Sequence, residues 1–395
     1  MSYRVCVAGL MILVGAGGTS TARAGDSEEL ARVQKVMAVQ QLTEKTSASG
    51  YTYNTPASTC APCHADEYDA WNAGDGADFY AIETYTGGYM TGTPHRLAFL
   101  DESFHYHYVE NDSPEVCLRC HVPASVYTTY NWKLVKAPET RSLNSPNALE
   151  GVTCVTCHLD ETGTIRGEHS YGLDVSSHIV EADEEMFDGS KLCSSCHESI
   201  VYGALNSTYE QWEQQAEDTG VSCVDCHMVD LGDLETDAHN FPGAHSYSML
   251  EWGLDITWPT SLNSGSDYSV KACNYSAGHN VPTGDQFRAY VFHVEIKGGS
   301  INYKHDKYIS PKFITPYMRE IVDYDRYEPV PFNDCRNLPY DDVDLPAGTY
   351  TVTYELGFWL LKPTQIKRFG DAGAINNPGE VYTKVDGKTY TLTVR

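Results

Sequence analysis

Ten of the thirteen cysteines lie in five pairs, each with two residues between the cysteines and a histidine directly after them. Two thiols at this spacing can add to the two vinyl groups of one porphyrin, and the next imidazole can then bind the iron from below. The pattern predicts five covalently attached haem c groups. We number the sites I to V: Cys60/Cys63/His64, Cys117/Cys120/His121, Cys154/Cys157/His158, Cys193/Cys196/His197 and Cys223/Cys226/His227.

Two other uses of paired cysteines are considered. Paired C-x-x-C segments also build zinc sites with four cysteine ligands, or close small disulfide loops. Neither use explains why a histidine stands at the same offset in all five sites. Five pairs also cannot be divided evenly among sites that need two pairs each. Haem attachment is therefore the favoured interpretation.

The spacing between the sites predicts crowded haems. Successive motifs begin between 30 and 57 residues apart, so the haem region runs from Cys60 to about His245. A segment this short cannot build a separate apolar core around each porphyrin. We expect the porphyrins to form much of the core and to lie close together. Close haems exchange electrons, which favours a role in electron transfer.

The second axial ligand of each iron is expected to be histidine. The chain has fifteen histidines, so ten remain after the five motif histidines. Two histidine ligands leave no open position on the iron and favour electron transfer over substrate binding. We expect five residues as sixth ligands, with His105, His107 and His169 as alternates: His95, His178, His239, His245 and His279.

Local sequence context guides this choice. His95 follows TGTP, in which Thr93 can cap a helix and Pro94 can open it. Two of the other candidates frame HNFPGAH, where Pro-Gly favours a tight turn, and His279 lies in the similar segment AGHNVPTG. Glycine and proline restrict such loops to a few conformations, so they can hold an imidazole still.

The alternative for any of these residues is a surface or hydrogen-bonded histidine. We expect that role for His293 and His305, which stand in strand-like or charged segments. Methionine is a weaker rival as a ligand, because Met228 adjoins motif V and cannot reach the opposite face of its haem.

The N-terminus reads as a signal peptide, residues 1–24. Arg4 supplies the positive charge, residues 5–14 form a short apolar segment, and Ala22-Arg23-Ala24 fits a cleavage site. The apolar segment is too short to span a bilayer comfortably, so no transmembrane anchor is expected. These features predict an exported protein of the periplasm, the cell surface or the extracellular space.

The charge of the chain limits its partners. The net charge is −27, from 54 acidic and 27 basic residues. Nucleic acid and anionic membranes are therefore not expected as partners. We expect redox partner proteins or extracellular electron acceptors instead.

Three regions follow the signal peptide. Residues 25–50 have the apolar spacing of a helical arm. Residues 51–256 form a loop-rich pentahaem cytochrome c region, in which STYEQWEQQAEDTG predicts a helix with a capping box of Ser207 and Glu210 and an end at Gly220.

Alternating runs then mark a C-terminal antiparallel β-domain, residues 257–395, with a sandwich-like arrangement. The strand-like segments are YSVKACNY, RAYVFHVEI, GTYTVTYELGFWLL and KTYTLTVR. Cys273 and Cys335 lie outside the motifs and are candidates for one disulfide. The predicted fold class is therefore α+β, with the β-domain serving in docking or assembly.

Residues 60–284 resemble the multihaem family that includes the tetrahaem cytochrome serving hydroxylamine oxidation. The matching segments are CLRCHVPAS, GVTCVTCH, CSSCHES, TYEQWEQQAEDTGVSCVDCHM and HNFPGAH. AGHNVPTG, which leads into a strand with Arg288, is similar to extended relatives with a β-domain. The resemblance implies haems stacked in parallel and perpendicular pairs, most of them bis-histidine. This chain departs from the family in having five motifs and a long β-domain.

Two functions are carried forward. The first is an electron carrier rather than an enzyme, passing electrons along packed haems between redox partners. As an acidic, tyrosine-rich exported chain it is also similar to secreted cytochromes that polymerise, so a homo-oligomer or extracellular filament is considered. The alternative is a multihaem reductase of nitrite or another nitrogen oxide, which needs one open iron. Pentahaem nitrite reductases typically carry lysine in place of one motif histidine, whereas all five motifs here end in histidine.

Overall fold

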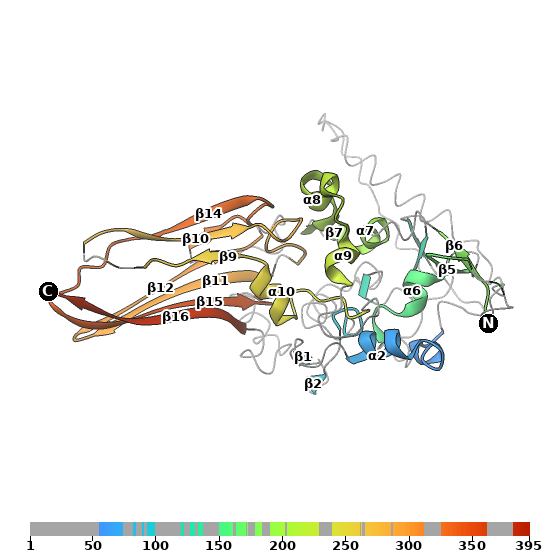
Figure 1. Ribbon diagram of the computed structural model, residues 1–395, viewed down its shortest axis with the longest axis horizontal. Coiled ribbons are helices and arrows are strands. Elements are labelled where there is room, and N and C mark those ends of the chain that lie inside the picture. The colour runs from blue at the N-terminus through green and yellow to red at the C-terminus, as the bar shows by residue number, and fades with distance from the viewer. Residues whose placement is uncertain are drawn as a thin grey trace, which may run out of the picture. The chain divides into compact units, whose positions relative to one another are not determined.

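Short helices joined by loops carry motifs III, IV and V (Figure 1). The structure, a computed structural model, describes residues 55–73, 82–83, 89–90, 93–98, 120–121, 127–130, 133–136, 150–160, 163–170, 172, 178–183, 190–201, 204–228, 239–260, 262, 265–285, 287–311, 325–361 and 382–395. The helical arm expected near the N-terminus, together with His105, His107 and Cys117, lies outside these residues. The helices are η1 (Ala57–Thr59), α2 (Ala65–Ala73), α6 (Cys154–His158), α7 (Lys191–His197), α8 (Thr208–Gln215), η3 (Glu217–Thr219), α9 (Cys223–His227) and α10 (Tyr247–Trp252).

Three of the motifs coincide with a helix that ends on the motif histidine: α6, α7 and α9. Side chains near the start of two of these helices bind the backbone just before them. The Thr156 hydroxyl accepts the N–H of Thr153 at 3.2 Å, and the Asp225 carboxylate accepts the N–H of Ser222 at 2.7 Å. Such bonds fix the start of a short helix that has too few internal bonds to be stable alone. The local sequence therefore places the two thiols and the imidazole on one turn.

Small two-stranded sheets occupy the connections between the motifs. Three are antiparallel and one, β5–β6, is parallel. Their strands are β1 (Ile82–Glu83), β2 (Tyr89–Met90), β3 (Tyr127–Tyr130), β4 (Lys133–Lys136), β5 (Ile165–Gly167), β6 (Val180–Ala182), β7 (Glu198–Val201) and β8 (Ala204–Ser207). None is long enough to provide a sheet core, in keeping with a loop-rich region.

The helix expected before motif V is present as α8, but its predicted capping box is wrong. The side chain of Ser207 makes no cap bond and instead accepts the Gln211 side-chain amide at 3.0 Å. The N–H of Glu210 donates to the carboxylate of Glu198 at 2.8 Å, so a carboxylate from outside the helix satisfies the first turn. The α-helix itself ends earlier than predicted, at Gln215, and Gly220, with a left-handed φ of 73°, instead ends the 3₁₀ helix η3 that follows.

The C-terminal region consists of two sheets that face each other as a sandwich (Figure 1). One sheet has the order β14-β10-β9 and the other the order β13-β12-β11-β15-β16, and only β12 and β13 pair in parallel. The predicted α+β class with a sandwich-like β-domain is confirmed. The strands are β9 (Asp255–Thr257), β10 (Tyr268–Asn274), β11 (Ala289–Gly298), β12 (Ile301–Ile309), β13 (Asp325–Tyr327), β14 (Asp334–Tyr340), β15 (Gly348–Trp359) and β16 (Tyr382–Val394).

The apolar core of this domain lies between the two sheets. Val270 and Leu338 from the small sheet and Phe292 and Tyr354 from the large one are fully buried. Cys273 and Cys335 stand opposite each other on β10 and β14 and are joined in a disulfide, with Cα atoms 4.0 Å apart. The alternation read from the sequence thus produces two inward faces, and the disulfide joins two neighbouring strands.

His293 on β11 allows a prediction about this domain. Its Nδ1 lies 2.5 Å from Asp306 on β12, and the carboxylates of Glu355 and Glu295 are also close. The hydrogen bond with Asp306 raises the pKa of His293, against the effect of burial. A raised pKa means that the stabilisation is complete below the unfolded value of about 6.5 and is lost as the pH rises through the folded value.

We therefore expect His293→Gln to be less stable than the wild type in mildly acidic solution, and this difference to shrink as the pH rises above neutrality. Urea unfolding of the haem-loaded proteins from pH 5.5 to 8.5 measures the difference directly. Equal pH dependence in the two proteins would show that the His293–Asp306 pair contributes nothing to folding.

Candidate haem-binding site

Four motif histidines each lie opposite a histidine from a distant part of the chain. Every one of these partners is among the five residues expected as sixth ligands. The ring centroids are 6.2 Å apart for His64 and His178, 6.3 Å for His197 and His95, 6.3 Å for His158 and His239, and 6.2 Å for His227 and His279.

This separation fits a metal ion held between two imidazoles. Metal–imidazole bonds are about 2.0–2.1 Å long and the ring centroid lies roughly 1.1–1.2 Å behind the bonding nitrogen, so the centroids should be about 6.2–6.6 Å apart. All four separations fall in this range and differ by only 0.1 Å. Ordinary ring contacts in the same region vary more, as with His95 and Phe241 at 4.3 Å. The four pairs therefore fit iron that takes its remaining ligands from a porphyrin.

Backbone carbonyls orient several of these rings. A carbonyl can only accept, so the Nδ1 that faces it must carry the proton, which leaves Nε2 with a lone pair for a metal. The bonds are His121 to Ala98 O at 2.5 Å, His158 to Arg166 O at 2.9 Å, His227 to Pro242 O at 2.6 Å and His279 to Asn280 O at 2.9 Å.

Burial also keeps the imidazoles neutral. It lowers the pKa of His95 to about 3 and the pKa values of His158 and His279 to about 4. Within the described residues, the buried Nδ1 of His95 has no hydrogen-bond partner. Neutral imidazole is the form that binds a metal, so these residues suit haem ligation at neutral pH.

The motif thiols show which motifs are neighbours. Hydrogen-bonding contacts join Cys60 of motif I to Cys154 of motif III, Cys120 of motif II to Cys196 of motif IV, and Cys193 of motif IV to Cys223 of motif V. As a free thiol, Cys60 has its pKa lowered to about 7 by the bond with Cys154. Cys157 of motif III is also close to both thiols of motif IV. Motif IV therefore adjoins motifs II, III and V.

Cys63 of motif I differs from the expectation that the haem sites form the core. Its thiol is exposed, whereas each of the other motif cysteines that the structure describes is half-buried. The reason is local, because residues 62–66, which lead into α2, are all exposed. The buried side chain of this helix is Trp71, further along the chain. Cys60 is thus the motif I thiol that faces another motif. Motif I lies at the edge of the group, and haem attachment through Cys63 stays a prediction.

The motif cysteines also bear on the alternative of small disulfide loops. In the described ranges, no motif cysteine is joined in a disulfide to the other cysteine of its own pair. The disulfide in these ranges is the one between Cys273 and Cys335 in the β-domain. Haem attachment requires the two cysteines of a motif to be outside disulfides.

A single turn, residues 93–98, connects two of the motifs. Where the structure describes the segment after Thr93, residues 94–98 form a turn rather than the expected helix, and the Thr93 hydroxyl accepts the N–H of Arg96 at 3.2 Å. The same hydroxyl donates to the carbonyl of Trp71 on α2 at 2.8 Å. His95 in this turn faces motif IV, while the carbonyl of Ala98 orients the histidine of motif II.

Gly151 packs directly against this turn. It has a φ of 65°, and a Cβ added there would lie 2.3 Å from the carbonyl oxygen of His95. The same carbonyl accepts the N–H of Val152 at 2.9 Å. The chain entering motif III therefore supports the residue that faces motif IV, and only glycine allows this approach.

The loop HNFPGAH contacts three pairs. His239 belongs to the pair of motif III, and Pro242 O holds the histidine of motif V. Between them Phe241, with a φ of 46°, places its ring 4.3 Å from His95 and 6.0 Å from His239. The sequence pointed to the histidines of this loop but not to Phe241, whose role depends on residues far away in the chain.

The other histidines have different surroundings. His245 is not among the four pairs; it ends the same loop and is buried, with 3% of its surface exposed. The alternate His169 is exposed. In the β-domain, His293 binds Asp306 and His305 lies 3.3 Å from the hydroxyl of Tyr303, the hydrogen-bonded state expected for both.

No competing site is evident within the described residues. They contain no group of three or more His, Cys, Asp and Glu side chains that could hold a metal ion.

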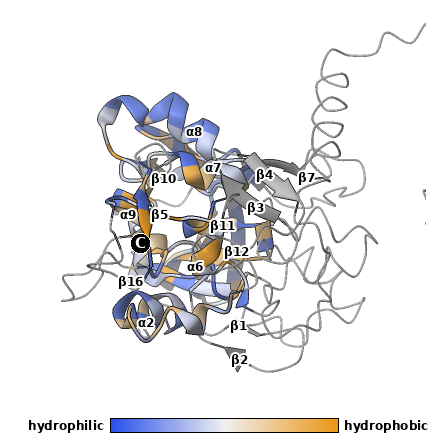
Figure 2. Cartoon of the chain, turned by 90° about the vertical axis from the view of Figure 1, so that its right-hand side faces the viewer, coloured by the Kyte–Doolittle hydropathy of each residue, from blue (hydrophilic) through white to orange (hydrophobic). Residues whose placement is uncertain are grey.

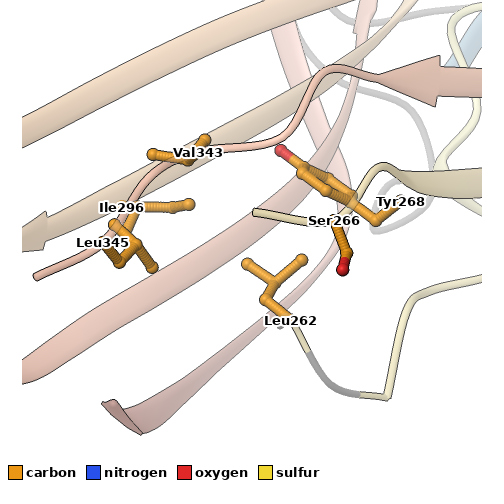
Figure 3. Close-up of a pocket in the computed structure, with 6 residues that line it drawn as sticks. All are labelled: Leu262, Ser266, Tyr268, Ile296, Val343 and Leu345. Atoms are coloured by element: carbon orange, nitrogen blue, oxygen red, sulfur yellow. The ribbon is translucent and has the colours of Figure 1, made fainter. Parts of the chain in front are cut away.

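A small pocket between the sheets has a volume of about 10 Å³, room for a single water, and is lined largely by apolar side chains (Figure 3). Of the helices in these ranges, none is long and apolar enough to cross a membrane.

Comparisons with known proteins agree with this geometry. Residues 59–159, which contain motifs I to III, match the family described as cytochrome c554 and c-prime. The fold is similar to that of a penta-heme cytochrome c552 from Thermochromatium tepidum, with a TM-score of 0.61 and 18% identity over 86% of this chain and 99% of that chain. No curated protein matches the sequence. The family match thus covers three of the five motifs, and the structural likeness, at 18% identity, shows a shared fold.

Gly151 provides a test of the packing between motifs. Gly151→Ala should destabilise the haem-loaded protein more than Gly220→Ala, a matched control that also has a left-handed φ but no atom within 4 Å of an added Cβ. Gly220→Ala should lower the free energy of unfolding by about 1–2 kcal/mol, through backbone strain alone. In Gly151→Ala, the clash with His95 O should lower the free energy of unfolding by about 1–3 kcal/mol more. Chemical unfolding of both variants measures this, and equal losses would mean that the turn moves aside freely.

Proposed function

We propose that the chain is a pentahaem electron carrier in which at least four irons, and by our assignment all five, have two histidine ligands. The observation that carries this proposal is the set of four histidine pairs, each joining one motif histidine to one other histidine at 6.2–6.3 Å. Unrelated surface histidines have no reason to share one separation. Iron with two histidine ligands suits electron transfer because no position is open to a substrate.

In this proposal the motif cysteines attach the haems and the paired histidines are the axial ligands. His178, His239, His95 and His279 serve motifs I, III, IV and V. For motif II we assign His245, which is buried at the end of the loop that packs on His95. The carbonyl of Ala98, three residues beyond His95, orients the motif II histidine, His121. The turn of residues 93–98 is therefore in contact with both motif II and the loop that ends at His245. His105 and His107 are the alternates for this position.

The contacts between motif thiols support an order for electron transfer. Motif I adjoins motif III, motif III adjoins motif IV, and motif IV adjoins both II and V. When bound, each haem supplies one-electron redox chemistry at its iron. The chain's own residues keep both axial positions filled, hold the imidazoles neutral and bring neighbouring motifs together. We infer a branched path centred on motif IV rather than a single line.

The reductase of nitrite or another nitrogen oxide is the second candidate. It needs an open iron, and motif II is the place for one because its sixth ligand is assigned here by position rather than by ring separation. The four pairs favour the carrier, since each fills both axial positions of its iron.

The remaining features of the proposal concern location and partners. A signal peptide of residues 1–24 and the charge of −27 support an exported protein that meets redox proteins or extracellular acceptors. We retain the division into a helical arm, a haem region (51–256) and a β-domain (257–395) as a prediction. Assembly into an oligomer or filament is a further prediction, which electron microscopy of concentrated secreted protein tests.

His95→Ala tests the ligand assignment. The change should open the iron of motif IV, so that one haem in five becomes high-spin and binds carbon monoxide. His169→Ala is the control, because His169 is exposed, and should leave the spectrum unchanged. Mass spectrometry of the same samples should show a chain beginning at Gly25 with five haems. Fewer haems, or carbon monoxide binding by the unmodified protein, would favour another ligand set or the reductase.

A further inference from the structure

Helix α8 presents a stripe of polar side chains to the loop that carries His279. Thr208, Gln211 and Gln215 are spaced by three and four residues and so lie along one side of the helix. Figure 2 shows that α8 is largely hydrophilic. A polar stripe on a partly buried helix requires hydrogen-bond partners, and residues 280–283 provide most of them.

The hydrogen bonds converge on Asn280 and Thr283. The side-chain oxygen of Gln211 accepts the N–H of Asn280 at 3.2 Å and the hydroxyl of Thr283 at 2.8 Å. Gln215 donates to the side-chain oxygen of Asn280 at 2.9 Å, and the hydroxyls of Thr208 and Thr283 lie 3.0 Å apart. Asn280 is therefore held through both its backbone and its side chain.

Fixing Asn280 fixes the adjacent imidazole. The carbonyl of Asn280 accepts the Nδ1 proton of His279 at 2.9 Å, so the ring direction follows the position of that peptide. The carbonyl of His279 is held by Asn274 at 2.7 Å. Outer hydrogen bonds of this kind set the orientation of a metal-binding histidine.

The same helix is tied to the entrance of motif V. Trp212 donates its indole N–H to the carbonyl of Val221 at 2.9 Å, two residues before Cys223. Gly278 approaches closely, since a Cβ there would lie 2.8 Å from Cβ of Ala216. One helix thus contacts both the segment leading to the motif histidine and the loop carrying the opposite histidine.

We propose that α8 is the positioning element of the motif V haem, with Gln211 and Gln215 fixing the distance and ring angle of His279 relative to His227. The two rings are 14° from parallel, the smallest angle among the four pairs. The angle between axial imidazole planes determines how the iron d orbitals split, and therefore the low-spin signal of that haem. The inference rests on the proposed ligation by His279, and neither glutamine touches the iron.

The test compares variants of the full haem-loaded chain by electron paramagnetic resonance and carbon monoxide binding. Gln211→Met with Gln215→Met removes the bonds to the loop while keeping side-chain length. Gln214→Met is the matched control, because this exposed neighbour binds only Glu210 among the described residues. We expect the double variant to shift or lose one low-spin signal of five, with a change in one redox potential, and the control to match the wild type.

A rescue variant separates positioning from general packing. Gln211→Glu keeps an oxygen that can accept from Asn280 and Thr283, so this single variant should show the wild-type signal. Gln211→Met lacks that oxygen and should perturb the signal. An unchanged spectrum in the double variant would overturn the proposal. The proposal would also be overturned by a change in all five haem signals, or by a failure of both Gln211→Met and Gln215→Met to fold as single variants. In either case α8 would serve folding in general.

His279→Ala distinguishes this inference from the proposed function. If it opens one iron to carbon monoxide but the glutamine variants change nothing, the ligation stands and the positioning role fails. If it opens no iron, the proposed ligation of motif V is itself wrong, and the role of α8 falls with it.

Discussion

The structure depends on one repeated constraint: two imidazoles from distant segments must be held about 6.3 Å apart, the separation that metal–imidazole bonds require. The paired histidines are 114, 102, 81 and 52 residues apart in the chain, counted from His64–His178, His95–His197, His158–His239 and His227–His279. Closing such long loops costs conformational entropy, which the short helices and two-stranded sheets of this region cannot offset alone. Iron–histidine bonds and porphyrin burial would supply the missing stabilisation, which explains how the short helices and small sheets that the structure describes around the motifs suffice.

Given that constraint, the loops between motifs must be rigid rather than merely short. The turn of residues 93–98 and the loop from His239 to His245 each contact more than one pair, through backbone carbonyls and through the ring of Phe241. Each such contact makes one ligand depend on another motif. Gly151 shows the same dependence in the backbone, since the entrance to motif III supports His95 of the motif IV pair. The proposed ligands therefore lie in one connected framework, and a change at one site reaches its neighbours.

This framework also explains what the sequence could and could not predict. Motif spacing identified the cysteines and motif histidines, and the expected sixth ligands included His95, His178, His239 and His279, which the structure places opposite motif histidines. Period-two alternation identified the strands of the sandwich, because burial on one face imposes that pattern locally. Which histidine faces which motif was not predictable, because it depends on long-range closure. The exposure of Cys63 was missed for the same reason, since five identical motifs carry no signal of which one lies at the edge.

Local rules failed where distant residues intervene. The capping box at Ser207 is absent because the carboxylate of Glu198, outside the helix, accepts the N–H of Glu210 that the local rule assigned to the hydroxyl of Ser207. Phe241 and the glutamines of α8 have no local signal at all. Their roles appear only when the loops that they contact have been brought together. The loop of His279 is the clearest case, and it changes how the β-domain should be viewed.

This loop connects β10 to β11, and buried Asn274 at the end of β10 holds both His279 O at 2.7 Å and Val330 O at 3.1 Å. Val281 and Val330 exchange two backbone bonds of 2.9 Å, and Cys273, next to Asn274, is in the disulfide. The position of His279 is thus fixed by the β-domain on one side of the loop and by α8 on the other. Any difference in the affinity of oxidised and reduced iron for His279 must, by linkage, appear as a difference in the stability of this junction. Under the proposed ligation by His279, the β-domain is coupled to the redox state of motif V through this loop.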